Sequence, residues 1–79
     1  HIISVTHKPV AYSAHAEIRL KQRRITRREV RAVLATGVVS ELPNGGTRKD
    51  AVVDGRRIAV LYREYRGRLH IWTVMLVPN

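Results

Sequence analysis

The stretch that decides the fold is ITRREVRAVLATG, residues 25–37. Thr26 and Glu29 have the spacing of a capping box, in which the threonine side chain and the glutamate side chain each bond the other's backbone N–H. Ile25 and Val30 occupy the two positions of a hydrophobic staple around that box. These signals predict that a helix begins directly after the threonine.

The predicted helix covers residues 27–36. Val30, Val33 and Leu34 give it one apolar stripe, which is typical of a helix that packs on a core. Gly37 is predicted to end it in the left-handed conformation that glycine adopts easily. Beyond this glycine the apolar pattern changes to a period of two, so the chain is expected to pass from helix to strand.

Another helix is predicted before this one. Ser13 is a suitable N-cap, and the helix that follows it is expected to run to about Arg23. Residues 1–12, interrupted by Pro9, are expected to form an N-terminal tail or an edge strand. Because a chain of 79 residues can build only one modest core, residues 13–79 are predicted to form a single domain.

Four strands are predicted after the second helix. Asp54 and Gly55 form a strong signal for a tight hairpin between the second and third of them. The last strand is the most apolar and is expected to lie centrally in the sheet. The predicted strands cover residues 38–42, 47–53, 56–64 and 69–77. The sequence therefore predicts an α+β fold, with two N-terminal helices packed on a four-stranded antiparallel sheet.

The charge of the chain indicates its class of partner. Fifteen Lys and Arg residues face six Asp and Glu residues, which gives a net charge of +9. Most of the cations are arginines, whose planar guanidinium matches phosphate oxygens, so nucleic acid is the predicted partner. A basic surface without a specific partner is the alternative. The residues predicted to hold RNA phosphates without taking part in chemistry are Arg23, Arg24, Arg27, Arg28, Arg48 and Lys49.

Other classes are disfavoured. The chain has no cysteine, which excludes disulfides and cysteine-ligated zinc. The histidines lack metal-ligand spacing, so we expect no metal and no cofactor. The apolar runs are too short for a membrane span, and no signal peptide is recognisable. Because the sequence begins with His1 rather than Met, we expect a processed piece or an excised domain of a longer protein.

The first helix carries the candidate chemistry. At 100° per residue, Glu17, Lys21 and Arg24 lie on the expected solvent face. His15 and Arg19 lie on an arc with apolar residues on both sides, so they are predicted to face the protein or the rim of a groove. They could be a partly buried histidine and an arginine paired with a carboxylate. However, carboxylates are few, and a phosphate would relieve the cost of crowding these cations.

Phosphodiester cleavage suits such a pair, since histidine transfers protons and arginine stabilises developing charge. In the last strand Thr73 is predicted to share a face with four apolar residues, where its hydroxyl could hold a phosphate oxygen. Thr73 could also be present only as a good strand former. Tyr62 could add a hydroxyl or a stacking ring. We expect His70 to pack in the sheet, with the role of proton donor as a reserve. The predicted catalytic residues are His15, Arg19, Thr73 and Tyr62.

A family resemblance supports this interpretation. YSAHAEIRLKQRRITRREVRAVLATG, residues 12–37, together with HIWTVMLVP, residues 70–78, resembles a small uncharacterised-domain family of bacterial toxin-like proteins. That family's pattern is a Ser-x-His-Ala helix opening, an Arg four residues after the His, R-x-I-T/S-x-x-E-V at the second helix, a following Gly, and TV in the last strand. Here the pattern falls on Ser13, His15, Ala16, Arg19, Arg23 or Arg24, Ile25, Thr26, Glu29, Val30, Gly37, Thr73 and Val74.

The family is similar in turn to the barnase, EndoU, colicin and RelE (BECR) superfamily of metal-independent ribonucleases. The resemblance implies two helices on an antiparallel sheet and a toxin that cleaves transfer RNA or messenger RNA in the bacterial cytoplasm. It implies an acidic antitoxin in the toxin's own cell, or an immunity protein where the domain is the C-terminal warhead of a secreted polymorphic or contact-dependent toxin. It also implies active-site roles for His15, Arg19 and Thr73, whereas Tyr62 rests only on its position.

Three functions follow as hypotheses. The first is an RNA endonuclease without metal, in which the RNA 2′-hydroxyl attacks the adjacent phosphorus and leaves a 2′,3′-cyclic phosphate. The second is a non-catalytic basic module that binds RNA or DNA. The third is a protein-interaction domain whose basic face docks an acidic partner.

Overall fold

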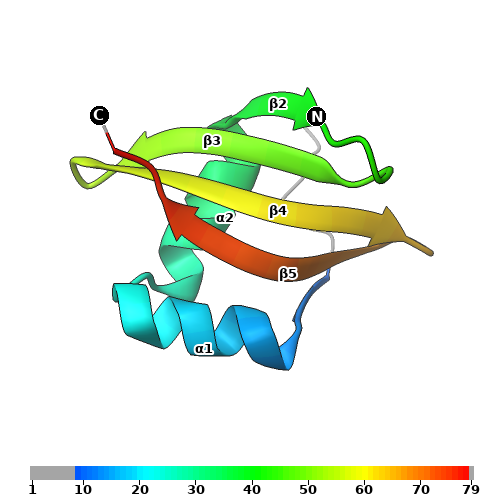
Figure 1. Ribbon diagram of the computed structural model, residues 1–79, viewed down its shortest axis with the longest axis horizontal. Helices are drawn as coiled ribbons and strands as arrows, with labels where there is room; N and C mark the ends of the chain where they lie inside the picture. The colour runs from blue at the N-terminus through cyan, green and yellow to red at the C-terminus, as the bar shows by residue number, and fades with distance from the viewer. Residues whose placement is uncertain (1–8, 79) are drawn as a thin grey trace, which may run out of the picture.

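The computed structural model describes residues 9–78 of the chain. In this part of the chain, one helix lies behind a five-stranded sheet and another lies along its edge (Figure 1). The elements are β1 (Val10–Tyr12), α1 (Ala14–Arg23), α2 (Arg27–Thr36), β2 (Val38–Glu41), β3 (Thr47–Val53), β4 (Arg56–Tyr65) and β5 (Arg68–Leu76). The predicted α+β class is therefore confirmed, and the helix spans agree with those predicted.

The sheet differs from the prediction in one strand. Its order is β1-β5-β4-β3-β2, and β2 to β5 form the predicted antiparallel meander. The prediction of a four-stranded antiparallel sheet is wrong because β1 adds a fifth strand, parallel to β5, although an edge strand is one of the two alternatives predicted for residues 1–12. Parallel pairing needs a crossover connection, and here α1, α2 and three strands lie between the two partners. The expected interior position of the last strand is confirmed, since β5 has a neighbour on each side.

The start of α2 follows the predicted capping box. The Glu29 backbone N–H donates to Thr26 Oγ1 at 3.1 Å, and the Thr26 backbone N–H donates to Glu29 Oε1 at 2.9 Å. The predicted stripe of Val30, Val33 and Leu34 is buried where α2 packs on β3 and β4. Local sequence signals thus place this helix on the sheet.

Gly37 ends α2 differently from the prediction. Its φ of −71° and ψ of 157° are extended, so the expected left-handed conformation is wrong. Its N–H donates to the Val33 carbonyl oxygen at 2.7 Å. A Cβ on Gly37 would lie 2.5 Å from that oxygen and 3.0 Å from the Lys49 Cβ. Glycine is needed here because the end of α2 approaches β3 closely. The left-handed helix end is instead at Arg24, after α1, with φ 53°.

Gly37→Ala is expected to destabilise the fold by about 1–3 kcal/mol, since the added methyl group forces the end of α2 away from β3. Chemical denaturation measures the change. Thr36→Ala, one residue earlier and exposed, is the matched control and should stay within about 0.5 kcal/mol of the wild type. A Gly37→Ala protein as stable as the wild type would contradict the close approach.

A β-bulge in β5 changes which side chains share a face. Leu61 of β4 pairs with Thr73, and the next residue, Tyr62, pairs with Ile71, so Trp72 is an extra residue in β5. Val74 and Ile71 are therefore both buried against the helices. The prediction that Thr73 shares a face with Ile71 is wrong, because the bulge moves it to the opposite face.

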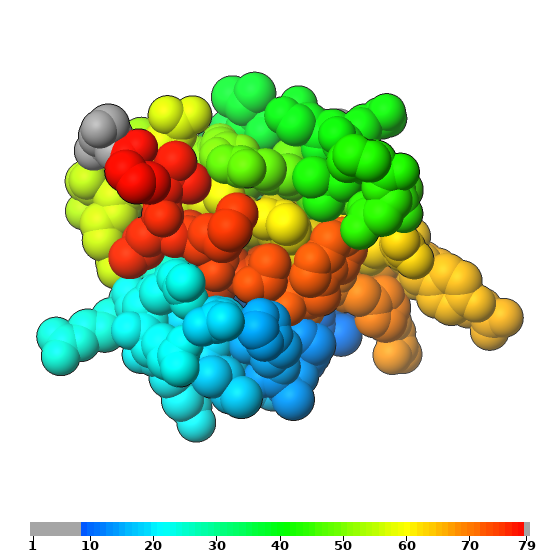
Figure 2. Space-filling model, viewed as in Figure 1, coloured from blue at the N-terminus to red at the C-terminus, as the bar shows by residue number. Residues whose placement is uncertain are grey.

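We call the sheet face opposite α2 the open face. In Figure 1 it is turned toward the viewer, with α2 behind the sheet and α1 along the edge beside β5. In the same view, Figure 2 shows the side chains of α1, blue to cyan, directly against those of β5, in orange to red. The open face carries Arg48, Asp50, Arg57, Leu61, Arg63, His70, Trp72, Thr73 and Met75. Neither helix within residues 9–78 is long and apolar enough to cross a membrane.

Candidate functional site

The start of α1 is fixed to the bulge of β5. The Ser13 backbone N–H donates to the Ile71 carbonyl oxygen at 3.0 Å, and its hydroxyl donates to the Trp72 carbonyl oxygen at 3.3 Å. The same hydroxyl accepts the backbone N–H three residues on, as an N-cap does. This junction fixes the start of α1, and with it the backbone that leads to His15, beside β5.

Three polar side chains of α1 form one cluster. Arg19 donates from Nε to His15 Nε2 at 3.3 Å and from Nη1 to Gln22 Oε1 at 2.7 Å. Spacings of four and three residues place these side chains on one side of the helix. An imidazole nitrogen is a group that can transfer protons in catalysis. The guanidinium beside it can bind a phosphate.

His15 lies at a rim and does not face the core. Ala16 and Leu20 are buried against the sheet, but His15 is exposed and Ile18, on its other side, is 52% exposed. Of the two orientations predicted for His15, toward the protein or along a rim, the one toward the protein is wrong, because α1 lies along the sheet edge and buries a narrow stripe. Arg19 is half-buried, at the border between the two sides. The predicted solvent face of α1 is confirmed, as Glu17, Lys21 and Arg24 are exposed.

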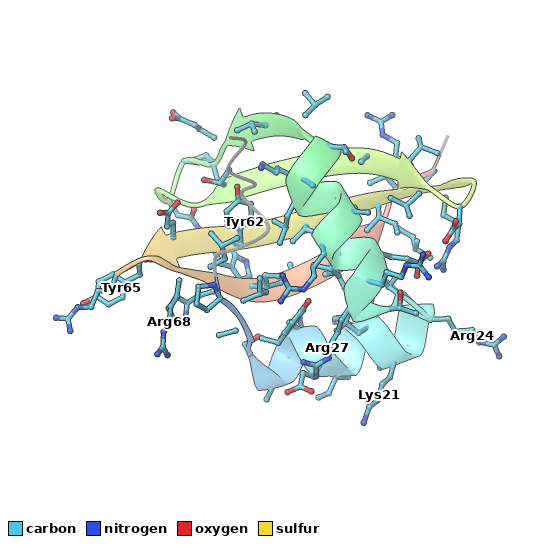
Figure 3. All side chains as sticks on the ribbon, turned by 180° about the vertical axis from the view of Figure 1, so that it is seen from behind. Lys21, Arg24, Arg27, Tyr62, Tyr65 and Arg68 are labelled. Carbon is cyan, nitrogen blue, oxygen red and sulfur yellow. The ribbon has the colours of Figure 1, made fainter. Side chains whose placement is uncertain are left out.

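Tyr62 is not part of this junction. Its side chain is only 7% exposed and belongs to the hydrophobic core. Figure 3, seen from behind, shows Tyr62 on the side of the sheet that carries α2. Thr73 lies on the open face, so the sheet separates the two hydroxyls. The structure therefore gives no support to a catalytic role for Tyr62.

The predicted phosphate-binding residues of β3 point to opposite faces. Arg48 lies on the open face and forms a two-bond ion pair with Asp50, both bonds 2.8 Å long. The Arg48 hydrogen bonds hold the pKa of the Asp50 carboxyl below its usual value. Lys49 Nζ instead donates to the Leu34 carbonyl oxygen at 2.6 Å and fastens β3 to the end of α2.

The remaining predicted phosphate-binding residues lie around the two helices. Arg27 donates to Glu17 at 2.8 Å, and its guanidinium lies 4.6 Å from the centre of the Tyr12 ring. Arg28 is exposed, Arg23 is half-buried, and Figure 3 shows Arg24 extending away from the molecule. The predicted basic patch is therefore divided between the helices and the open face.

Two residues that the sequence interpretation missed line a hollow next to the junction. This hollow has a volume of about 470 Å³, and Asn44 and Arg63 line it together with Ser13, His70 and Trp72. Arg63 stands directly opposite His70 in the sheet register. The residues of the hollow form no sequence motif. Only the length of the hairpin between β4 and β5 could have indicated that Arg63 and His70 face each other.

Within residues 9–78, no three His, Asp or Glu side chains gather into a group that could hold a metal ion. Two of the four histidines, His1 and His7, lie outside the described residues.

Comparison with protein families identifies the domain. A family model described as "Domain of unknown function (DUF4258)" matches residues 12–76, which include His15, Arg19 and Thr73. No curated protein and no solved structure was found to match the chain. The match runs from the end of β1 to the end of β5. The chain therefore belongs to the DUF4258 family.

Proposed function

We propose that this protein is an RNA endonuclease that works without a metal ion. The observation that carries the proposal is the His15–Arg19 pair, joined at 3.3 Å on α1, which packs beside β5, the strand that contains Thr73. An imidazole, a guanidinium and a hydroxyl are groups that suit a cyclising phosphodiester cleavage. The net charge of +9 supports a phosphate-rich substrate.

In the proposed reaction, Arg19 turns from His15 Nε2 to the phosphate, and Nε2 takes the proton from the RNA 2′-hydroxyl as the hydroxyl oxygen attacks the adjacent phosphorus. The new bond joins phosphorus to the 2′-oxygen, and the bond to the 5′-oxygen breaks as that oxygen takes a proton from solvent. Arg19 and Thr73 donate hydrogen bonds to the phosphate oxygens, where negative charge develops. Glu17, Glu29 and Asp50 are each held by an arginine, and we assign the role of base to His15.

The biological setting of the proposal is a bacterial toxin of the BECR type. Transfer RNA or messenger RNA would be the substrate, and an acidic antitoxin or immunity protein would neutralise the domain. The support for this setting is the likeness in motif order described above, together with a basic surface that an acidic protein can cover.

The purified protein is expected to cleave RNA in the presence of EDTA and to leave 2′,3′-cyclic phosphate ends, because the attacking group belongs to the RNA itself. An oligonucleotide with one ribonucleotide in a DNA strand should be cut only after that ribonucleotide. The matching all-DNA strand, which lacks the 2′-hydroxyl, is the control and should remain intact.

The alternative is a non-catalytic module that binds RNA or DNA. The placement of exposed arginines around both helices and on the open face would suit it. In that case the RNA would be bound with a steep dependence on salt concentration and would remain uncut.

A further inference from the structure

The hollow beside the proposed site has an aromatic wall. Trp72, the extra residue of the bulge, lies on the open face and reaches across β4 to the start of β3. A Cβ placed on Gly46 would lie 2.2 Å from Trp72 Cη2, so the end of the indole covers the backbone of that glycine. Trp72 also lines the hollow and is only half-buried. A flat ligand can therefore stack on it.

Two polar side chains near the indole, Arg63 and Asn44, offer hydrogen-bond donors. Arg63 uses one guanidinium nitrogen to donate to the Asn44 carbonyl oxygen at 2.9 Å, which leaves its other N–H groups for a ligand. Asn44 Oδ1 accepts the Gly46 N–H at 3.0 Å, so its side chain can offer the amide NH₂. His70, opposite Arg63, is exposed and adds a ring nitrogen. None of the residues that line the hollow is acidic.

We propose that this hollow binds one nucleobase, stacked on Trp72, and prefers guanine and uracil, which carry a carbonyl oxygen (O6 or O4) where adenine and cytosine carry an amino group. The inference rests on the proposed function in that RNA is the ligand. Bases stack on aromatic side chains of RNA-binding proteins, and arginine bonds the O6 and N7 acceptors of guanine. In adenine and cytosine an amino group takes the place of that carbonyl. The donors of Arg63 and Asn44 would then face a donor of the base and could not bond it. About 470 Å³ is within the range of ligand pockets, about 300–1,000 Å³.

The hollow also lies where a base next to the cleaved phosphate would be expected. Ser13 lines the hollow and is fixed to the Trp72 carbonyl oxygen, and His15 follows two residues later on α1. A nucleotide bound at Trp72 would thus place its sugar and phosphate toward the junction of α1 and β5. Base binding would then select which phosphate the proposed site receives.

Trp72 is the only tryptophan of the chain, so its fluorescence reports on the hollow directly. We expect quenching on titration with each nucleoside 5′-monophosphate, and no quenching with ribose 5-phosphate, which lacks a base. The dissociation constants should be about 3–10-fold lower for guanosine and uridine monophosphate than for adenosine and cytidine monophosphate, as one or two hydrogen bonds give. Midpoints are compared rather than amplitudes, because bases differ in how strongly they quench.

Two variants test the residues. Arg63→Gln should raise the dissociation constant of guanosine monophosphate about 5-fold or more, while Arg66→Gln, in the exposed turn outside the hollow, is the matched control and should leave it unchanged. Gly46→Ala should weaken binding of all four nucleotides by displacing the indole. Because that variant could also disturb the fold, the Arg63→Gln comparison is the deciding one.

The outcomes separate this inference from the proposed catalysis. Quenching that depends on the base, in a protein that leaves RNA intact, would support the nucleobase site and overturn the nuclease proposal. Two results in a protein that cleaves RNA would overturn the nucleobase inference alone. One is quenching of the Trp72 fluorescence by ribose 5-phosphate as strong as that by the nucleotides. The other is equal affinity for adenosine monophosphate and guanosine monophosphate. His15→Ala should bind nucleotides like the wild type, since His15 is outside the hollow.

Discussion

Replacing His15 with alanine is expected to slow RNA cleavage by about 10²–10⁴-fold, the usual contribution of a proton-transferring side chain. His15 is exposed, so its removal creates no cavity in the core. Alanine also has a high helix propensity, and α1 should therefore form as before. Single-turnover rates in EDTA, measured beside thermal unfolding, should show a protein of unchanged stability that has lost its chemistry.

The matched control for this variant is Lys21→Ala, on the solvent face of the same helix. It should cleave RNA within about 2-fold of the wild type, since one exposed charge contributes little to binding at moderate salt. RNA affinity should stay nearly constant in His15→Ala, because the proposed phosphate ligand is Arg19. Equal cleavage by His15→Ala and the wild type would rule out the proposed mechanism, and a loss confined to RNA affinity would favour the binding module.

The sequence predicts those parts of the fold that local interactions determine. The capping box of Thr26 and Glu29 involves residues three apart, and α2 begins where it indicates. The hairpin of Asp54 and Gly55 forms because both adopt positive φ, 52° and 79°, which matches the twist of the flanking strands. Each of these signals acts within one turn of the chain, so one segment is enough to recognise it.

The parts that were wrong depend on contacts between distant segments. β1 pairs with β5, which lies almost at the other end of the chain. A strand of three residues is too short for its sequence pattern to indicate which strand it pairs with. Gly37 is extended where the chain leaves α2 beside Lys49 of β3, 12 positions further along the chain, and the sequence of the helix alone does not show that neighbour. The bulge at Trp72 follows from how β5 fits β4, and it reverses the predicted face of Thr73.

The candidate site shows the same division. The spacing of His15 and Arg19 predicts that they meet on one side of a helix, and they do so at 3.3 Å. Whether that side is buried depends on where α1 lies against the sheet, which the helix alone does not reveal. Tyr62 was selected by strand position, and its burial shows that a residue type suited to RNA is also suited to a core.

One ion pair that joins α2 to the sheet should control stability. Arg56, the first residue of β4, donates to both carboxylate oxygens of Glu29, at 2.9 and 2.7 Å. The same guanidinium donates to the carbonyl oxygens of Arg23 and Arg24 at the end of α1. Glu29 therefore completes the cap of α2 and also holds the residue that ties both helices to β4.

Glu29→Ala is expected to lower the free energy of unfolding by about 2–3 kcal/mol. Breaking a buried ion pair typically costs about 3–5 kcal/mol, and the figure is reduced here because the Arg56 side chain is 34% exposed. For a domain of this size the melting temperature should fall by about 10–20 °C. Glu41→Ala, which removes an exposed carboxylate of β2, is the control and should change the free energy of unfolding by less than about 0.5 kcal/mol.

The same carboxyl should make stability depend on pH in acid. The hydrogen bond from the Thr26 backbone and those from Arg56 hold the pKa of Glu29 below its usual value in the folded protein. The folded protein therefore binds a proton less readily than the unfolded chain. The Glu29 contribution to the free energy of unfolding is complete above the usual pKa of about 4.3 and is lost as pH falls through the lower folded pKa.

Glu29→Gln, which keeps the cap geometry without the charge, should be less stable than the wild type near neutral pH by an amount that shrinks in acid. Asp50 also has a lowered pKa, but it is present in both proteins and cancels from their difference. Denaturant unfolding from pH 7 to pH 3 measures that difference, and a constant value across the range would contradict the role assigned to the Glu29 charge.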